Sequence, residues 1–209
     1  GQFLTDRSGT VETMSTSAED LRTIALTEFA TAGYAATSLH RIAELAGLSK
    51  SSVLYHYESK DALLGSAVQP AITALCEILD ELESRPRTRA TRTRFIEAFV
   101  DFLLDHTLEV NLFINQGPSL VDVPVVDSAN AAVIRLAEYF FTTTTTTEEW
   151  MRFGVALGGA AYMLASQRTM GFDPAPREET RTVLVGILGE LLAPVKTRPA
   201  QAGPAKAKG

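Results

Sequence analysis

"LHRIAELAGLSKSSVLYHYESK", residues 39–60, contains two short helical patterns on either side of a glycine. The first covers 39–46 and repeats apolar side chains at the three- and four-residue spacing of one helix face. Gly47 can adopt the positive φ at which helices often end, and Ser49 is a typical N-cap for a second helix over 50–56. Two helices joined by so short a turn are predicted to form a helix-turn-helix.

The second helix carries polar side chains on the face that points away from its partner. With Val53 turned inward, this outward face holds Lys50, Ser51, Ser52, Tyr55 and His56. Hydroxyl, ammonium and aromatic groups suit a helix that enters the major groove of DNA. The same spacing also occurs at ordinary helical corners, so the spacing alone leaves both a DNA-binding and a purely structural reading open.

Helical periodicity dominates the rest of the chain, and no convincing alternating strand pattern is present. We therefore expect an all-α fold of about nine helices. Several helix starts are marked by N-cap residues, namely Ser17, Thr37 or Ser38, Ser59, and Thr146, which forms a capping box with Glu149.

Three features predict interruptions in this helical pattern. Pro70 lies within the long helix expected over 60–83, where a proline predicts a kink or break. The arginine-rich run "SRPRTRATRTR" over 84–94 predicts a solvated hinge between long helices. The threonine run over 142–147 predicts an exposed loop.

Composition limits the classes of protein that this chain can represent. The net charge of −6 argues against a protein that coats nucleic acid non-specifically, but it permits a local DNA-reading surface. The longest apolar run, 153–165, is too short to cross a bilayer as a helix, and no N-terminal secretion signal is recognisable. Cys76 is the only cysteine, which excludes an internal disulfide and is consistent with a reducing compartment.

No catalytic or metal-binding constellation is recognisable in the sequence. The three histidines, His40, His56 and His106, are not paired at helical ligand spacing, so no metal site is expected. No nucleophile has a recognisable partner, and no glycine loop could cradle a phosphate. We therefore expect neither an enzyme nor a cofactor.

The continuous run "TSLHRIAELAGLSKSSVLYHYESKDALL" (37–64) resembles the N-terminal signature of the TetR/AcrR family of bacterial transcriptional regulators. The preceding "LRTIALTEFATAGYAAT" (21–37) resembles the first helix of that family, and together the two segments cover about a quarter of the chain. The resemblance implies an N-terminal three-helix DNA-binding domain, followed by a helical domain for ligand binding and dimerisation. It also implies that the long fourth helix acts as a lever between them.

The resemblance also implies roles for individual residues. Thr37 and Lys60 match positions that contact DNA phosphates, and Lys50 matches the start of the recognition helix. The full set implied to contact DNA is Thr37, Ser38, Ser49, Lys50, Ser51, Ser52, Tyr55, His56, Tyr57 and Lys60. Leu54 stands where the family often has a tyrosine, which leaves open which neighbouring side chain reaches the DNA backbone and which packs inward.

Two further sets of residues concern the C-terminal helices. Small and apolar residues form stripes on which a second copy could lie, and family resemblance implies that they form the dimer interface: Gly154, Gly158, Ala161, Ala165, Leu184, Ile187, Leu188 and Leu191. Simple internal packing of these helices is the alternative. Surplus aromatic surface, together with the resemblance, implies a ligand pocket formed by Phe99, Phe102, Leu103, Phe113, Asn115, Gln116, Tyr139, Phe153, Tyr162 and Met163.

These observations predict four parts of the chain: an extension over 1–16, a helix-turn-helix domain over 17–64, a ligand-binding and dimerisation domain over 65–195, and a disordered tail over 196–209. We expect a cytoplasmic, homodimeric regulator, most simply a repressor, that binds palindromic double-stranded operator DNA and responds to a hydrophobic small molecule. No membrane partner is expected. The alternative is a helical small-molecule-binding module whose DNA-binding face is vestigial.

Overall fold

The computed structural model describes residues 18–141, 146–167, 170, 171 and 173–194. All regular structure in these residues is helical, which confirms the predicted all-α fold. The α-helices are α1 (Ala18–Ala32), α2 (Leu39–Leu45), α3 (Lys50–His56), α4 (Lys60–Ser84), α5 (Arg89–Asp105), α6 (Thr107–Gln116), α7 (Pro124–Phe140), α8 (Thr147–Ser166) and α9 (Arg177–Leu191), and a 3-10 turn, η1 (Gly117–Ser119), follows α6. The predictions for the cap at Ser17, for 1–16, for most of the threonine run and for 196–209 lie outside the described residues.

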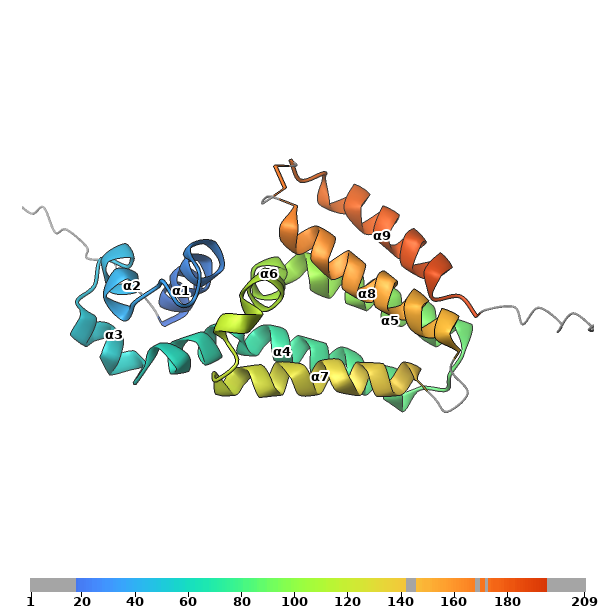
Figure 1. Ribbon diagram of the computed structural model, residues 1–209, viewed down its shortest axis with the longest axis horizontal. Helices are drawn as coiled ribbons and strands as arrows, with labels where there is room; N and C mark the ends of the chain where they lie inside the picture. Colours follow the sequence, from blue (N-terminus) through green and yellow to red (C-terminus); the bar gives the residue numbers. More distant parts are fainter. Residues whose placement is uncertain (1–17, 142–145, 168–169, 172, 195–209) are drawn as a thin grey trace, which may run out of the picture.

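Two hydrophobic clusters form the core, and α4 contributes to both. The first packs α1, α2 and α3 against the first half of α4, and it also takes in Leu112 of α6. The second packs the end of α4 with α5, α7, α8 and α9. Figure 1 shows α1–α3 at one end of the molecule, with α4 and α7 running side by side along its lower edge and α8 and α9 above them. The helix-turn-helix therefore packs against the same helix, α4, that supports the C-terminal helices.

Pro70 lies inside α4, and the helix continues through it, so the predicted break does not occur. A proline lacks the N–H that would donate to the carbonyl of Ser66. Pro70 lies on the exposed side of α4, where water can hydrogen-bond that carbonyl. Buried leucines on both sides, including Leu63 and Leu79, hold the helix in place.

By length and composition α4 could also cross a membrane. Its apolar residues are shared between the two core clusters, and core helices pass the same test, so this is weak evidence for a membrane span.

Side-chain caps set the starts of several helices close to where the sequence predicts them. Ser49 and Ser59 accept from the backbone N–H groups of Ser52 and Ala62, and they cap α3 and α4. Thr146 and Glu149 form the predicted capping box at α8.

The hinge between α4 and α5 is shorter than predicted. Thr88 accepts from the N–H of Thr91 and begins α5 at Arg89, so only 85–88 of the arginine-rich run lies outside helices. The predicted hinge is too long because Thr88 is an N-cap in the middle of a polar run, and the many charges of that run make the cap hard to recognise.

Candidate nucleic-acid interface

The turn between α2 and α3 holds the two helices at a fixed angle. Gly47 has a φ of +66°, and its N–H donates to the carbonyl of Glu44 at 3.1 Å. The N–H of Leu48 then donates to the carbonyl of Ala43 at 2.8 Å. Val53 is fully buried against the core, so the inner face of α3 is fixed by packing.

The opposite face of α3 points to solvent, as predicted. Lys50, Ser51, Tyr55 and His56 are exposed, and Ser52 is half-buried. Tyr55 is 87% exposed, which is unusual for a large aromatic side chain. Leu54 is 41% exposed, so neither it nor Tyr55 packs inward; Val53 fills that place.

Three hydroxyl groups gather at the start of α3. The Ser49 oxygen lies 2.8 Å from the hydroxyl oxygens of both Ser51 and Ser52. Lys50 supplies a basic side chain next to them in the sequence, and Tyr55 and His56 form an edge-to-face ring pair further along α3. This face carries hydrogen-bond donors and one cation, which suits contact with phosphate and base edges.

Thr37 and Lys60 are oriented differently from the predicted phosphate contacts. Thr37 is buried, and its hydroxyl donates to the carbonyl oxygen of Gly33 at 2.8 Å; Ser38 caps α2 in its place. The Lys60 ammonium donates to the carbonyls of Tyr34 at 2.9 Å and Thr37 at 3.1 Å. The two side chains therefore fasten the α1–α2 connection onto the start of α4.

Tyr34 completes this fastening. Its ring lies 4.1 Å from the Lys60 ammonium, and its hydroxyl donates to the Asp61 carboxylate. Burial, and then the hydrogen bond and negative charge of Asp61, raise the pKa of Tyr34 well above its ordinary value, so the phenol stays protonated and keeps donating. Tyr57 plays a similar part on the other side: it is half-buried, and its hydroxyl donates to the carbonyl of Ala18 at 3.3 Å.

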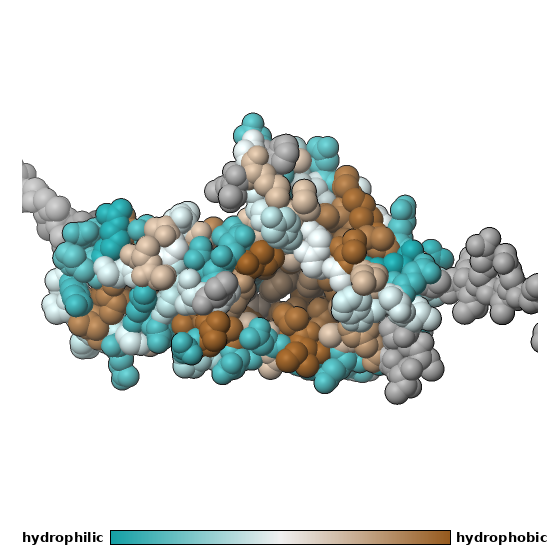
Figure 2. Space-filling view, in the orientation of Figure 1, coloured by the Kyte–Doolittle hydropathy of each residue, from teal (hydrophilic) through white to brown (hydrophobic). Residues whose placement is uncertain are grey.

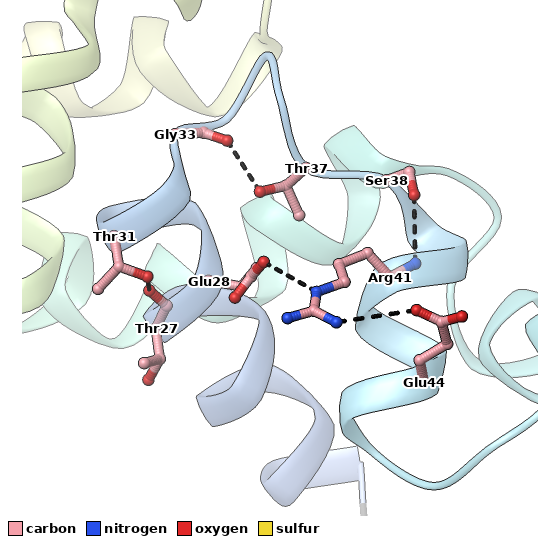
Figure 3. A network of polar contacts seen from close by, with 8 residues as sticks. All are labelled: Thr27, Glu28, Thr31, Gly33, Thr37, Ser38, Arg41 and Glu44. Atoms are coloured by element: carbon pink, nitrogen blue, oxygen red, sulfur yellow. Dashed lines mark hydrogen bonds and ion pairs between the residues drawn. The ribbon is translucent and has the colours of Figure 1, made fainter.

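Arg41 links α2 to α1 (Figure 3). Its Nε lies 3.3 Å from Glu28 Oε1 on α1, and its Nη1 lies 3.9 Å from Glu44 Oε2 on its own helix. Figure 3 also shows the Thr37 hydroxyl turned back to Gly33 and the Ser38 hydroxyl at the start of α2. Glu28 and Glu44 are thus both paired with Arg41, which ties α2 to α1.

A cavity of about 570 Å³ lies between α4, α5, α6, α7 and α8. Figure 2 shows the surface hollowed at this place, with apolar side chains around the opening. Six of the residues predicted to form a ligand pocket line it: Phe99, Phe102, Leu103, Phe113, Phe153 and Tyr162. This volume and apolar lining are typical of sites for small organic molecules.

Four residues of the predicted pocket lie elsewhere. Asn115 and Met163 are exposed and do not line the cavity. The Gln116 side chain lies against Gly33, where its Oε1 would be 3.3 Å from an added Cβ, and Gly33 has a φ of +95°. Tyr139 stacks beneath Arg87, whose guanidinium carbon is 4.4 Å from the ring centroid. Helical spacing does not determine which face of a short helix meets a cavity, so these positions could not be separated from the sequence.

Two polar residues that line the cavity were not predicted, Glu109 and Asn130. For Glu109 a signal was present in the sequence. It stands three residues after His106, which places both side chains on one face of a helix. Asn130 has no comparable signal.

Helix α6 lies between this cavity and α1. Val110 and Ile114 line the cavity, while Leu112 is fully buried in the N-terminal cluster. A change in the shape of the cavity at α6 would therefore alter the packing between α6 and α1.

The exposed apolar surface of α8 and α9 differs in part from the predicted dimer stripe. Ala165 is buried within the chain, Leu188 is buried in the second cluster, and Leu184 and Leu191 pack against that cluster, so the three leucines hold α9 onto the core. Gly154, Gly158 and Ala161 line the cavity, and Ile187 is exposed. The large exposed apolar side chains on the two helices are Trp150, Met151, Val155, Tyr162, Met163, Val183 and Ile187.

Residues 22–67 match the family model described as bacterial regulatory proteins, tetR family. The solved structure of a probable transcriptional regulatory protein, RHA5900, has a similar fold, with a TM-score of 0.66 at 19% identity over 86% of this chain and 100% of that one. A TetR-family transcriptional regulator from Bordetella parapertussis 12822 gives 0.63 at 15% identity, over 84% and 94% of the two chains. SCO3833, a member of the TetR transcriptional regulator family from Streptomyces coelicolor A3, gives 0.57 at 23% identity, over 84% and 90%. No curated protein sequence matches the chain.

Proposed function

We propose that this chain, a DNA-binding regulator of the TetR family, acts as a homodimeric repressor that releases its operator when a small apolar molecule fills the cavity. The outward face of α3 carries the DNA-binding part of this proposal. Tyr55 projects into solvent from a helix whose opposite residue, Val53, is fully buried. A short helix that is fixed on one side and polar on the other can enter a major groove without rearranging.

The side chains on this face of α3 are suited to two kinds of contact with DNA. Lys50 and the hydroxyls of Ser49 and Ser51 are suited to phosphate oxygens, which set the position of the helix on the duplex. Tyr55 and His56 lie further along α3 and are suited to base edges or to the far strand. Because Lys50 is the one cation on α3, the dependence of binding on salt should be moderate.

The exposed apolar side chains of α8 and α9 support a dimer. Val155 and Ile187 are 60% and 47% exposed, and a Cβ added at Gly186, beside Ile187, would meet no atom within 4 Å, which leaves room for close approach of another helix. An apolar patch of this kind on a chain of ordinary composition is typical of a protein–protein interface. A two-fold dimer would place its two α3 helices in successive major grooves, about 34–36 Å apart, on a palindromic operator.

The position of α6 supports the response to a ligand. A molecule that binds one arrangement of the cavity more tightly shifts the population toward that arrangement. Since α6 contributes both to the cavity wall and to the cluster that holds α1, such a shift would change the placement of the DNA-binding helices. The regulator would act on DNA in the cytoplasm.

Fluorescence anisotropy with a labelled duplex from the region upstream of the gene tests this function. We expect sequence-specific binding that is weakened at least about tenfold by Lys50→Ala or Tyr55→Ala, as expected for loss of a phosphate or base contact. Arg94→Ala is the matched control, because it removes a positive charge from an exposed position on α5. Absence of specific binding, or equal losses in all three variants, would favour a small-molecule-binding module with a vestigial DNA-binding face.

A further inference from the structure

The cavity between α4 and α8 has a largely apolar lining that includes a few polar side chains. Of the described residues that line it, only Glu109, Asn130 and Tyr162 have polar side chains, and only Glu109 is charged. The remaining wall is aliphatic and aromatic, with Phe99, Phe102, Phe113 and Phe153 among its members. A ligand in this cavity would therefore meet one negative charge in apolar surroundings.

Glu109 is held in place within this wall. Its side chain is only 12% exposed, and its Oε1 lies 3.2 Å from Nδ1 of His106. His106 in turn packs its ring against Phe102, with 5.2 Å between the ring centroids. Within the described part of the chain, the other carboxylate oxygen of Glu109 has no hydrogen-bond or ion-pair partner. The position in the first turn of α6 favours a negative charge there.

The Glu109 carboxylate determines which ligand charge the cavity favours. A carboxylate beside an apolar cavity is costly unless a donor or a cation meets it. A protonated amine would satisfy the free oxygen with a charge-assisted hydrogen bond, and the aromatic rings would attract it further. An anionic ligand would be repelled, since none of the described residues that line the cavity is basic.

We propose that the cavity binds an apolar molecule that carries a protonated amine, and that Glu109 is the residue that selects for the amine. This inference rests on the proposed function, because it names the ligand class of the same cavity. It excludes long-chain carboxylates as preferred ligands, although the hydrocarbon part of the cavity would accept them.

Three probes with the same alkyl chain separate charge from apolar contact: decylamine, decan-1-ol and decanoate. Their affinities for the full chain can be measured at neutral pH by displacement of the neutral fluorophore N-phenyl-1-naphthylamine. We expect decylamine to bind about tenfold or more tightly than decanoate, with decanol between them, as a charge-assisted hydrogen bond predicts. Glu109→Gln should bring decylamine down to the affinity of decanol and leave decanol nearly unchanged.

Two control variants make the result specific to this site. Glu138→Gln removes an exposed acid of α7 outside the cavity and should keep the preference for the amine. Ala137→Phe adds a ring at the cavity wall and should weaken all three probes. The proposal is overturned if decanoate binds as tightly as decylamine, if Glu109→Gln keeps the amine preference, if Ala137→Phe leaves binding intact, or if no probe binds.

Operator binding is measured separately, so that the two proposals can fail independently. If decylamine binds through Glu109 but leaves the operator complex intact, the ligand class stands and ligand-induced release fails. If another apolar ligand releases the operator and Glu109→Gln does not change its effect, release stands and the amine preference fails.

Discussion

The Lys60 ammonium lies 2.9 Å from the carbonyl oxygen of Tyr34 and 4.1 Å from the centroid of its ring. The first residue of α4 thus holds the connection between α1 and α2 through both the backbone and the side chain of one residue. Since Tyr34 also donates to Asp61, the fastening depends on two consecutive residues of α4. These contacts of Lys60 and Asp61 with Tyr34 fix the orientation of the helix-turn-helix on α4.

Lys60→Met should therefore weaken DNA binding through lost positioning. The substitution keeps an apolar stem but removes two hydrogen bonds and the ring contact, so the free energy of unfolding should fall by about 1–3 kcal/mol. The slope of log affinity against log salt concentration should stay unchanged, whereas Lys50→Met should reduce it by about 0.9, the value for one phosphate contact. Anisotropy titrations over a salt series measure both slopes, and an equal reduction in the two variants would show that Lys60 contacts a phosphate.

Truncating a side chain to alanine should affect stability differently on the two faces of α3. Tyr55→Ala should leave the free energy of unfolding within about 0.5 kcal/mol of the wild type, because the side chain is exposed, but it should weaken operator binding. Val53→Ala should lower the free energy of unfolding by about 2 kcal/mol, because its side chain is fully buried. Urea unfolding and operator titration of each variant check the pair, and a large loss of stability in Tyr55→Ala would contradict the assignment of the outer face.

A charge on the exposed surface of α8 should disrupt the dimer. Val155→Glu places a carboxylate in the apolar patch that is proposed to bury itself against a second copy, where an unpaired charge is costly. Sedimentation velocity should show a monomer for this variant and a dimer for the wild type. Val121→Glu, at another exposed valine between η1 and α7, should remain dimeric. Equal behaviour of the two variants would place the interface elsewhere.

The ion pair between Asp101 of α5 and Arg181 of α9 should make stability depend on pH in the acid range. Hydrogen bonds from the Arg181 guanidinium, at 2.6 and 2.8 Å, hold the pKa of Asp101 below its ordinary value, against the opposing effect of burial. A lowered pKa in the folded state adds stability above the unfolded-state pKa of 3.8, and this is lost as the pH falls through the folded-state pKa. Asp101→Asn should therefore lower the melting temperature at neutral pH, and the difference should vanish on acidification. A difference that grows on acidification would contradict this sign.

Much of the N-terminal region could be predicted because its signals are local. Gly47 and the caps at Ser49 and Ser59 depend on residues within one turn of the chain, and α3 runs from Lys50 to His56 as the sequence predicts. The orientations of Thr37 and Lys60 could not be predicted in this way. They depend on carbonyl groups that the α1–α2 connection brings to the start of α4, and this is a tertiary arrangement.

The C-terminal region shows the limits of periodicity more clearly. A stripe of small residues on α8 fits both a helix of a second copy and the wall of a cavity, and Gly154 and Gly158 line the cavity. Leu188 and Ala165 follow the same apolar pattern, but they are buried within the chain. Only the packing of α8 between α6 and α9 separates these roles.

Hydroxyl-radical footprinting on a genomic fragment selected by the protein tests the central claim, that the outer face of α3 reads DNA as a pair. We expect two symmetric protected patches on one face of the duplex, about 34–36 Å apart, and the loss of both in Tyr55→Ala at a protein concentration that saturates the wild type. Protection that does not depend on sequence, or two patches that persist unchanged in Tyr55→Ala, would contradict it.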